Sequence, residues 1–177
     1  MKNIYTLLSI LIISLTVYLS FDDLMPSSVK SIESTGFSFD NALNHLKVIS
    51  KEPHYTGSKY HQDVQNYIVN ELKKMGLETE IQNQVVLSSR RVGTNAANII
   101  GTIKGSRKGK SLVLLTHYDS SAHSSFGASD AGSGVVTILE GFRAFLLNNN
   151  TPVNDIHLVF TDAEEMGLLG AEAFVKN

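Results

Sequence analysis

The sequence predicts an α/β fold with a mostly parallel, mixed sheet flanked by helices. Two observations carry this prediction. Residues 112–115 and 156–160 are short, mostly apolar runs, which is typical of central strands that are buried on both faces. A segment with helical periodicity, 133–147, lies between them. This strand–helix–strand order implies a right-handed crossover between two parallel strands.

Length and composition indicate one packed domain and exclude several classes of site. The chain has 177 residues, of which 42% are hydrophobic and 18% are charged. Its net charge is −2, and no basic field marks a nucleic-acid partner. Because there is no cysteine, disulfides, catalytic thiols and thiolate metal sites are excluded. Any metal site must therefore be built from His, Asp and Glu.

Residues 1–21 predict a signal anchor or a signal peptide. An uncharged, apolar run over residues 3–21 is about long enough to cross a bilayer. Lys2 before this run and Asp22 and Asp23 after it favour an N-terminus inside and a domain outside the cytoplasm, in a periplasm, a lumen or the cell exterior. The small-residue pattern of a cleavage site is missing, which favours an uncleaved anchor; cleavage would give a secreted protein. A buried core helix is the alternative.

The remaining chain divides into a linker, 22–38, and a domain, 39–177. Pro, Ser, Thr and Gly are frequent in the linker. The domain should contain helices over 39–50, over 58–75 with Ser58 as N-cap and Gly76 as the stop, over 133–147 with Ser133 as N-cap, and over 168–175. Strands are expected over 78–87, 97–104, 112–116 and 156–161.

Three polar segments should meet at one edge of this sheet. Residues 117–120 follow one central strand, residues 127–134 precede a helix, and a Glu-Glu pair follows the other central strand. Parallel strands end at the same edge, where open α/β sheets place their chemistry. One imidazole and four carboxylates then converge, namely those of His117, Asp119, Asp130, Glu164 and Glu165.

Such a cluster of like charges becomes favourable when it binds a divalent metal. His117 and Glu165 can each bind a zinc ion, and Asp130 can bridge two. Asp119 can accept the second ring N–H of His117, which fixes the tautomer. Glu164 is then left to take a proton from water as general base. The alternatives are structural: Glu pairs favour helix N-termini, Asp130 can cap a helix, and Asp119 can be a plain loop residue.

The segments HYDS, GASDAGSG and FTDAEEMGLLGA together resemble the M28 zinc peptidases, and most closely the membrane-attached subgroup that includes endoplasmic-reticulum and vacuolar metallopeptidases. The resemblance spans about residues 40–177. It implies a zinc aminopeptidase/phosphorylase-like α/β/α sandwich that hydrolyses peptides at their N-termini with two Zn²⁺ ions. By this resemblance His117 and Glu165 are metal ligands, Asp130 is the bridging ligand, Glu164 is the general base and Asp119 orients the histidine.

The family completes its site with a further acidic residue and a histidine near the end of the domain. No residue before His117 has an equivalent place in the order of the motifs. The resemblance therefore implies an N-terminal fragment, truncated at the C-terminus and inactive alone. Two alternatives stay open: a non-catalytic remnant or interaction module, and a glutaminyl-cyclase-like zinc acyltransferase. The expected partners are peptides and, through the N-terminal segment, a membrane. No feature indicates an oligomeric state.

Two other features are expected to be structural. Residues 105–111, GSRKGKS, resemble a phosphate-binding loop, but they have one residue too few between the glycines and lead into a strand. A basic hairpin turn is therefore predicted there. His45 and His61 are expected on helix surfaces, and His54 is expected to support a turn before Gly57.

Overall fold

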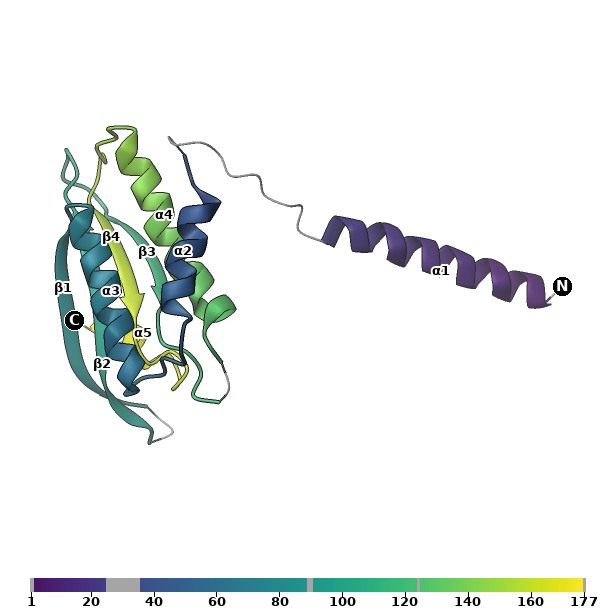
Figure 1. Ribbon diagram of the computed structural model, residues 1–177, viewed down its shortest axis with the longest axis horizontal. Coiled ribbons are helices and arrows are strands. Elements are labelled where there is room, and N and C mark those ends of the chain that lie inside the picture. The colour runs from purple at the N-terminus through teal and green to yellow at the C-terminus, as the bar shows by residue number, and fades with distance from the viewer. Residues whose placement is uncertain (1, 25–35, 89–90, 124, 177) are drawn as a thin grey trace. The chain divides into compact units, whose positions relative to one another are not determined.

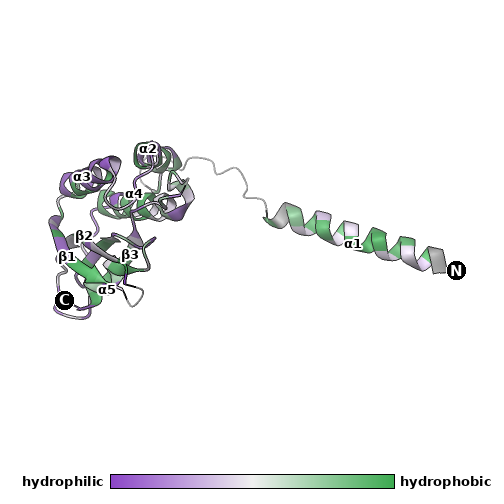
Figure 2. Cartoon of the chain, turned by 90° about the horizontal axis from the view of Figure 1, so that it is seen from below, coloured by the Kyte–Doolittle hydropathy of each residue, from purple (hydrophilic) through white to green (hydrophobic). Residues whose placement is uncertain are grey.

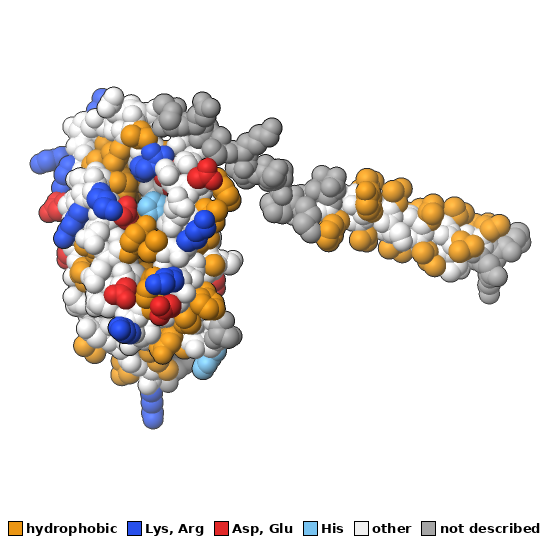
Figure 3. Space-filling model, in the orientation of Figure 1, with side chains coloured by type: hydrophobic (Ala, Val, Ile, Leu, Met, Phe, Trp, Pro, Cys, Tyr) orange, Lys and Arg blue, Asp and Glu red, His pale blue; other side chains and the backbone are white. Residues whose placement is uncertain are grey.

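The computed structural model describes residues 2–24, 36–88, 91–123 and 125–176, and the chain divides into two units, Met1–Ser31 and Ile32–Asn177. The first unit is helix α1 (Lys2–Leu24). Its segment Ile4–Phe21 has a mean hydropathy of 2.1, which makes it long and apolar enough to cross a membrane. Apolar side chains cover the visible face of this helix (Figure 3). The helix runs past the predicted boundary at residue 21, and most of the predicted linker lies outside the described residues.

The second unit is built on a four-stranded mixed sheet in the order β1-β2-β4-β3. Strands β3 and β4 are parallel, as predicted, and their register pairs His117 with Thr161. The β1–β2 and β2–β4 pairs are antiparallel, so parallel pairing is the minority among the described strands. The reason is that β1 and β2 form a hairpin at one side of the sheet. The strands are β1 (Glu78–Leu87), β2 (Gly93–Ile103), β3 (Leu112–His117) and β4 (Ile156–Thr161).

Helices cover both faces of this sheet and give three layers (Figures 1 and 2). Helices α2 (Phe39–Ile49), α3 (Lys59–Lys74) and α4 (Ser133–Leu147) pack on one face. Helix α5 (Leu169–Lys176) packs on the other, against β1 and β2. The predicted α/β class, with helices flanking a mixed sheet, is confirmed.

The main core lies between the sheet and the three-helix layer. Its fully buried side chains come from every element of that layer, and burying one of them contributes about 1.5–3 kcal/mol. They include Ile49, Ile68, Leu72, Ile99, Leu139, Leu158 and Phe160. A smaller core under α5 contains Val86, Ala96, Ala163, Leu169 and Ala173.

The helix ends follow the predicted signals at α3 but not at α4. The Ser58 hydroxyl accepts the backbone N–H of His61 at 3.2 Å, and Gly76 has a φ of 80°, which favours glycine at a helix stop. Ser133, however, is the first helical residue of α4, and Gly132 occupies the cap position. The Ser133 hydroxyl donates instead to the Ser129 carbonyl at 2.6 Å. The predicted N-cap role of Ser133 is therefore wrong.

A buried ion pair fastens the start of this unit to α4. The Glu140 side chain is fully buried and accepts hydrogen bonds from Arg143 and, at 2.7 Å, from the backbone N–H of Ser38. Arg143 in turn donates to the carbonyl of Gly36 at 3.1 Å. Burial alone raises the pKa of Glu140, but these hydrogen bonds outweigh it and hold the pKa below its ordinary value.

We expect Glu140→Gln to lower the free energy of unfolding by about 1–3 kcal/mol at neutral pH, because Arg143 loses its charged partner. The loss should shrink in acid. Since the folded pKa lies below the ordinary 4.5, the contribution of the carboxylate is complete above that value and disappears as the pH falls through the folded pKa. Urea unfolding of both proteins between pH 7 and pH 3 measures this. A difference that does not change with pH would contradict it.

Candidate metal centre

The candidate site lies at the edge of the sheet where β3 and β4 end. His117 is the last residue of β3, and Glu164 and Glu165 follow β4 closely. The backbone N–H of Tyr118 donates to the Thr161 carbonyl at 3.0 Å, which extends the parallel pairing past the strands. The structure therefore brings the two loops together as the sequence predicts.

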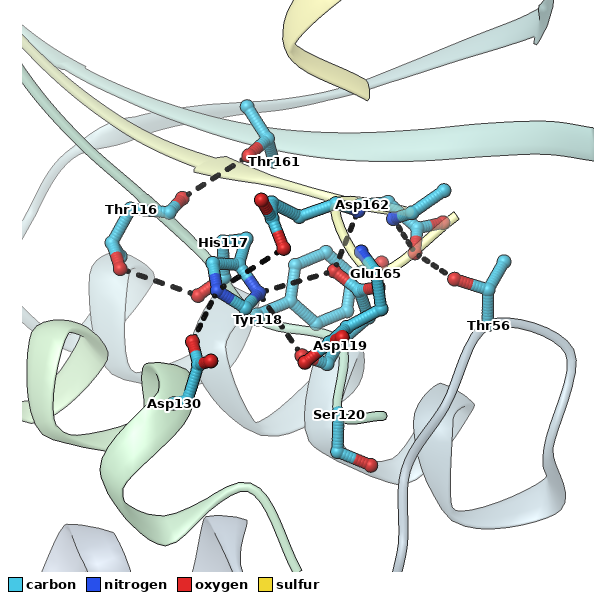
Figure 4. Close-up of polar contacts among 12 residues, drawn as sticks. Thr56, Thr116, His117, Tyr118, Asp119, Ser120, Asp130, Thr161, Asp162 and Glu165 are labelled. Atoms are coloured by element: carbon cyan, nitrogen blue, oxygen red, sulfur yellow. Dashed lines mark hydrogen bonds and ion pairs between the residues drawn. The ribbon is translucent and has the colours of Figure 1, made fainter. Parts of the chain in front are cut away.

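His117 presents one ring nitrogen to backbone and the other to carboxylates (Figure 4). Its Nδ1 lies 3.1 Å from the Asp119 carbonyl and 3.4 Å from Asp119 Oδ1. Because a carbonyl only accepts, Nδ1 donates its proton there, and Nε2 is the ring nitrogen that is left for a metal. Nε2 lies 2.9 Å from Asp130 Oδ1 and 3.8 Å from Glu164 Oε2.

Asp119 joins the two loops. Its side chain is 1% exposed, and its two carboxylate oxygens accept different backbone N–H groups. Oδ1 accepts the N–H of Glu164 at 3.0 Å, and Oδ2 accepts the N–H of Glu165 at 3.2 Å. Asp119 thus contacts His117 on one side and fixes both glutamates of the other loop by their backbone.

Asp130 enters the site from the turn before α4. It belongs to a short irregular helix, η1 (Ala128–Gly132), in which it has extended backbone angles of φ −120° and ψ 101°. The turn is entered through Gly127, whose φ is 63°. A Cβ at Gly127 would lie 2.7 Å from the ring of His54, so glycine is required there for space as well. The Asp130 side chain itself is 75% exposed.

The carboxylates give the site a strong preference for positive charge. Burial lowers the pKa of His117, but Asp119, Asp130 and Glu164 more than offset it and raise the pKa to about 9. Burial raises the pKa of Glu165, and the negative charges of Asp130 and Glu164 raise it further. A cation bound between these groups would replace the proton on His117 and neutralise the carboxylates. It would therefore relieve the mutual repulsion of the negative charges.

The donor set fits a zinc ion in part. Two donors on one tetrahedral zinc, each bound at roughly 2.0–2.1 Å, lie about 3.3 Å apart. The 2.9 Å between His117 Nε2 and Asp130 Oδ1 is close to this spacing. Among the described residues, however, no group of three His, Asp or Glu side chains is arranged to hold a metal. Of the predicted ligands His117, Asp130 and Glu165, the structure brings His117 and Asp130 to within ligand spacing.

A buried network that the sequence did not predict lies directly beneath the site. Asp162, which is fully buried, accepts hydrogen bonds from His61 Nε2 at 2.8 Å and from Thr56 Oγ1 at 2.9 Å. It also accepts the backbone N–H groups of Ala97 at 3.0 Å and Ala163 at 2.7 Å. These bonds hold the chain just before Glu164. Burial raises the pKa of Asp162, but the bond to His61 and the others lower it overall.

The prediction that His61 lies on the helix surface is therefore wrong, because the residue is buried and only 8% exposed. Its ring stacks on that of Tyr118, with centroids 5.0 Å apart. A sequence signal for this burial existed: His61 precedes Val64 by three residues and Ile68 by seven, so it falls on the apolar stripe of α3. The other histidine near the site, His54, is 1% exposed and donates its backbone N–H to Ser120 Oγ at 2.9 Å.

A pocket of about 370 Å³ opens beside Glu165. Asp119 and Glu165 are among the residues that line it. The lining includes Tyr55, Thr56, Ser121, Ala122, His123 and Met166. The pocket is large enough for an amino-acid side chain next to the candidate metal position.

The fold is that of an α/β protein in which helices flank a mixed sheet, and it is shared with solved zinc exopeptidases and glutaminyl cyclases. In fold the chain is similar to a Zn-dependent exopeptidase from Parabacteroides distasonis ATCC 8503, with a TM-score of 0.58 and 24% identity over 73% of this chain and 48% of that one. It is also similar to glutaminyl cyclase from Bacteroides thetaiotaomicron, with a TM-score of 0.68 and 26% identity over 82% of this chain and 58% of that one.

Sequence comparison gives the family. Residues 98–177 match peptidase family M28. A vacuolar membrane protease of Candida albicans (strain WO-1) is 30% identical over 182 residues, which cover 99% of this chain and 21% of the relative. Residues 98–177 belong to peptidase family M28, and the chain spans about a fifth of the length of the curated relatives it matches. The predicted family is confirmed.

Proposed function

We propose that the chain is part of a zinc-dependent metallopeptidase of the aminopeptidase type. The observation that carries this proposal is the position of His117 Nε2, which lies 2.9 Å from Asp130 Oδ1 and 3.8 Å from Glu164 Oε2. This arrangement combines two metal donors with a carboxylate that can move a proton. Family M28 membership supports the same activity.

In this proposal His117 and Glu165 each bind one of two zinc ions and Asp130 bridges them. Zinc, when bound, polarises a substrate carbonyl and lowers the pKa of water to about 7. Asp119 holds the His117 ring by Nδ1 and both glutamates by their backbone. Glu164, which is one-third exposed, takes the proton from the attacking water and passes it to the leaving amine.

The proposed substrate is a peptide whose N-terminal side chain enters the pocket beside Glu165, and the proposed location is a membrane. Helix α1 is apolar over Ile4–Phe21, and the Candida albicans relative is a vacuolar membrane protease. The residues that flank the apolar run, Lys2 and Asp22, favour a domain on the extracytoplasmic side. Helix α1 would then serve as the anchor.

Glu164→Gln tests the assignment of the general base. In a full-length version of the enzyme, the variant should bind as much zinc as the unmodified protein, about two ions, because Glu164 is not a proposed ligand. Its hydrolysis of amino-acid p-nitroanilides should fall by at least about 100-fold. Metal analysis after dialysis and a colorimetric assay measure the two quantities. Glu78→Gln, an exposed change at the start of β1, is the matched control. Unchanged turnover, or loss of zinc, in Glu164→Gln would contradict the role.

The structural similarity to a glutaminyl cyclase favours one second candidate function, zinc-dependent cyclisation of N-terminal glutamine. The products separate the two reactions. Hydrolysis of a Gln-X peptide adds water and releases glutamine, whereas cyclisation releases ammonia and leaves the peptide bond intact. Mass spectrometry of the products should show the hydrolysed peptide. A cyclised product, with one zinc per chain, would support the second function instead.

A further inference from the structure

The connection between β2 and β3 concentrates positive charge in a chain whose net charge is −2. Four of the 15 Lys and Arg residues lie within this short segment: Lys104, Arg107, Lys108 and Lys110. All four are exposed. Lys104 is paired with Asp155 at 3.1 Å, but the other three form no ion pair within the part of the chain that the structure describes. We call residues 104–110 the basic loop.

The basic loop is held in a fixed shape against the connection between α4 and β4. The backbone N–H groups of Ser106 and Arg107 donate to the carbonyls of Pro152 and Val153, both at 2.9 Å. The N–H of Gly105 donates to Asp155 Oδ1 at 2.8 Å. A hollow of about 540 Å³ opens among the loop residues and Asp155. The charges therefore lie on a folded surface whose backbone is fixed by hydrogen bonds, and not on a free tail.

This loop lies at the end of the domain where the chain enters from α1. Gly36, the first described residue of the domain, is bound by Arg143 in the C-terminal part of α4. The connection that follows α4 contacts the basic loop. Figure 1 shows α2 beginning at this end, and β3 and β4 pointing away from it. The candidate metal centre therefore lies at the opposite end.

The chain between α1 and the domain limits how far the domain can lie from a membrane that holds α1. Residues 25–35 separate Leu24 from Gly36 in the sequence. Even fully extended, a segment of this length spans at most about 40 Å. A compact domain of this size has a radius of gyration of about 14–15 Å. The tether therefore keeps every surface of the domain within reach of that membrane, and contacts of the domain itself must select the face that docks.

We propose that the basic loop docks on anionic lipid headgroups of the membrane that holds α1, and so orients the domain with its metal centre away from the lipid. This inference rests on the membrane anchoring in the proposed function, but not on the proposed activity. The three cations without ion-pair partners complement lipid phosphates and carboxylates, and the hollow beside Arg107 and Lys108 admits a headgroup. On a membrane surface that carries anionic lipid, the three charges should together favour the docked orientation by about 100-fold.

The experiment uses the full chain reconstituted in vesicles. Because the chain has no cysteine, a single one can be introduced and labelled with a fluorophore. Ser106→Cys places the label on the basic loop, and Asn95→Cys places it on β2 near the opposite end. Vesicles of phosphatidylcholine, with or without about 30% phosphatidylserine to supply an anionic surface, carry a quencher on the headgroup. Co-flotation with the vesicles checks the anchor separately.

We expect quenching at Ser106→Cys to exceed that at Asn95→Cys several-fold in anionic vesicles, and to weaken without phosphatidylserine. Neutralising Arg107, Lys108 and Lys110 to Gln should abolish the difference. Changing Lys47, Lys51 and Lys59 to Gln, which removes the same charge from α2, α3 and the connection between them, should not. Equal quenching at both positions in a co-floating protein would overturn the docking alone. Failure to co-float would overturn the anchoring and the docking together, whatever the zinc content.

Discussion

His117→Ala should lower the affinity of the chain for zinc by more than about 100-fold, which exceeds the effect of losing an outer-shell partner. The imidazole supplies the only uncharged donor of the proposed set, and its Nε2 is already oriented by the contact of Nδ1 with the Asp119 carbonyl. Without it, Asp130 and Glu164 face each other with no group between them. Competition with a chromophoric zinc chelator measures the affinity.

His157→Ala is the matched control for this prediction. His157 lies on β4 and contacts Thr102 at 2.9 Å, near the other end of the strand from the site. Its removal should leave zinc affinity unchanged. Equal affinities of His117→Ala and the parent chain would refute His117 as a ligand. Equal losses of zinc affinity in both variants would mean that these histidines support folding and do not bind the metal.

Asp162→Ala should lower the free energy of unfolding by about 3–5 kcal/mol, the range for breaking a buried, charged partnership. The change leaves His61 and Thr56 without the acceptor that they share. It also leaves the backbone N–H groups of Ala97 and Ala163 without a partner. Each such buried donor retains its desolvation cost. Chemical denaturation followed by circular dichroism measures the loss.

Asp63→Ala provides the comparison, because Asp63 is an exposed carboxylate on α3. Its loss should change stability by no more than about 0.5 kcal/mol. Asp162→Asn should fall between the two, since an amide oxygen still accepts but carries no charge. A stability of Asp162→Ala close to that of the parent chain would show that the network contributes little to the fold.

The strands and helices were predictable because each carries a local pattern. Residues 156–160 are apolar on both faces, and the structure places β4 inside the sheet. The parallel pairing of β3 with β4 is confirmed, but the prediction of β3 as a central strand is wrong, because β3 lies at the edge of the described sheet with Leu112 and Leu115 about half exposed. Ser58 and Gly76 marked the ends of α3 by their cap chemistry. The predominance of antiparallel over parallel strand pairs could not be predicted in this way. It depends on the β1–β2 hairpin, and strand direction is a long-range property that no local periodicity records.

The site was predictable to the extent that it follows from strand ends. Placing His117 and Glu164 at the ends of two parallel strands was enough to bring them together. The partners of Asp162 were missed, because His61 and Thr56 come from a distant segment that only packing brings under the site. The contact of His117 Nδ1 could not be predicted either. The acceptor that lies closer to Nδ1 is the backbone carbonyl of Asp119 and not its carboxylate.

Asp119 has a consequence for how substitutions in this region combine. One carboxylate binds the backbone of Glu164 and of Glu165, and the same residue contacts the ring of His117. Residues that share a partner do not contribute independently, so the energetic effects of changing them do not sum. The two loops therefore form a single cooperative unit, although they lie far apart in the sequence. The effect of any one substitution there depends on which of the other residues is still in place.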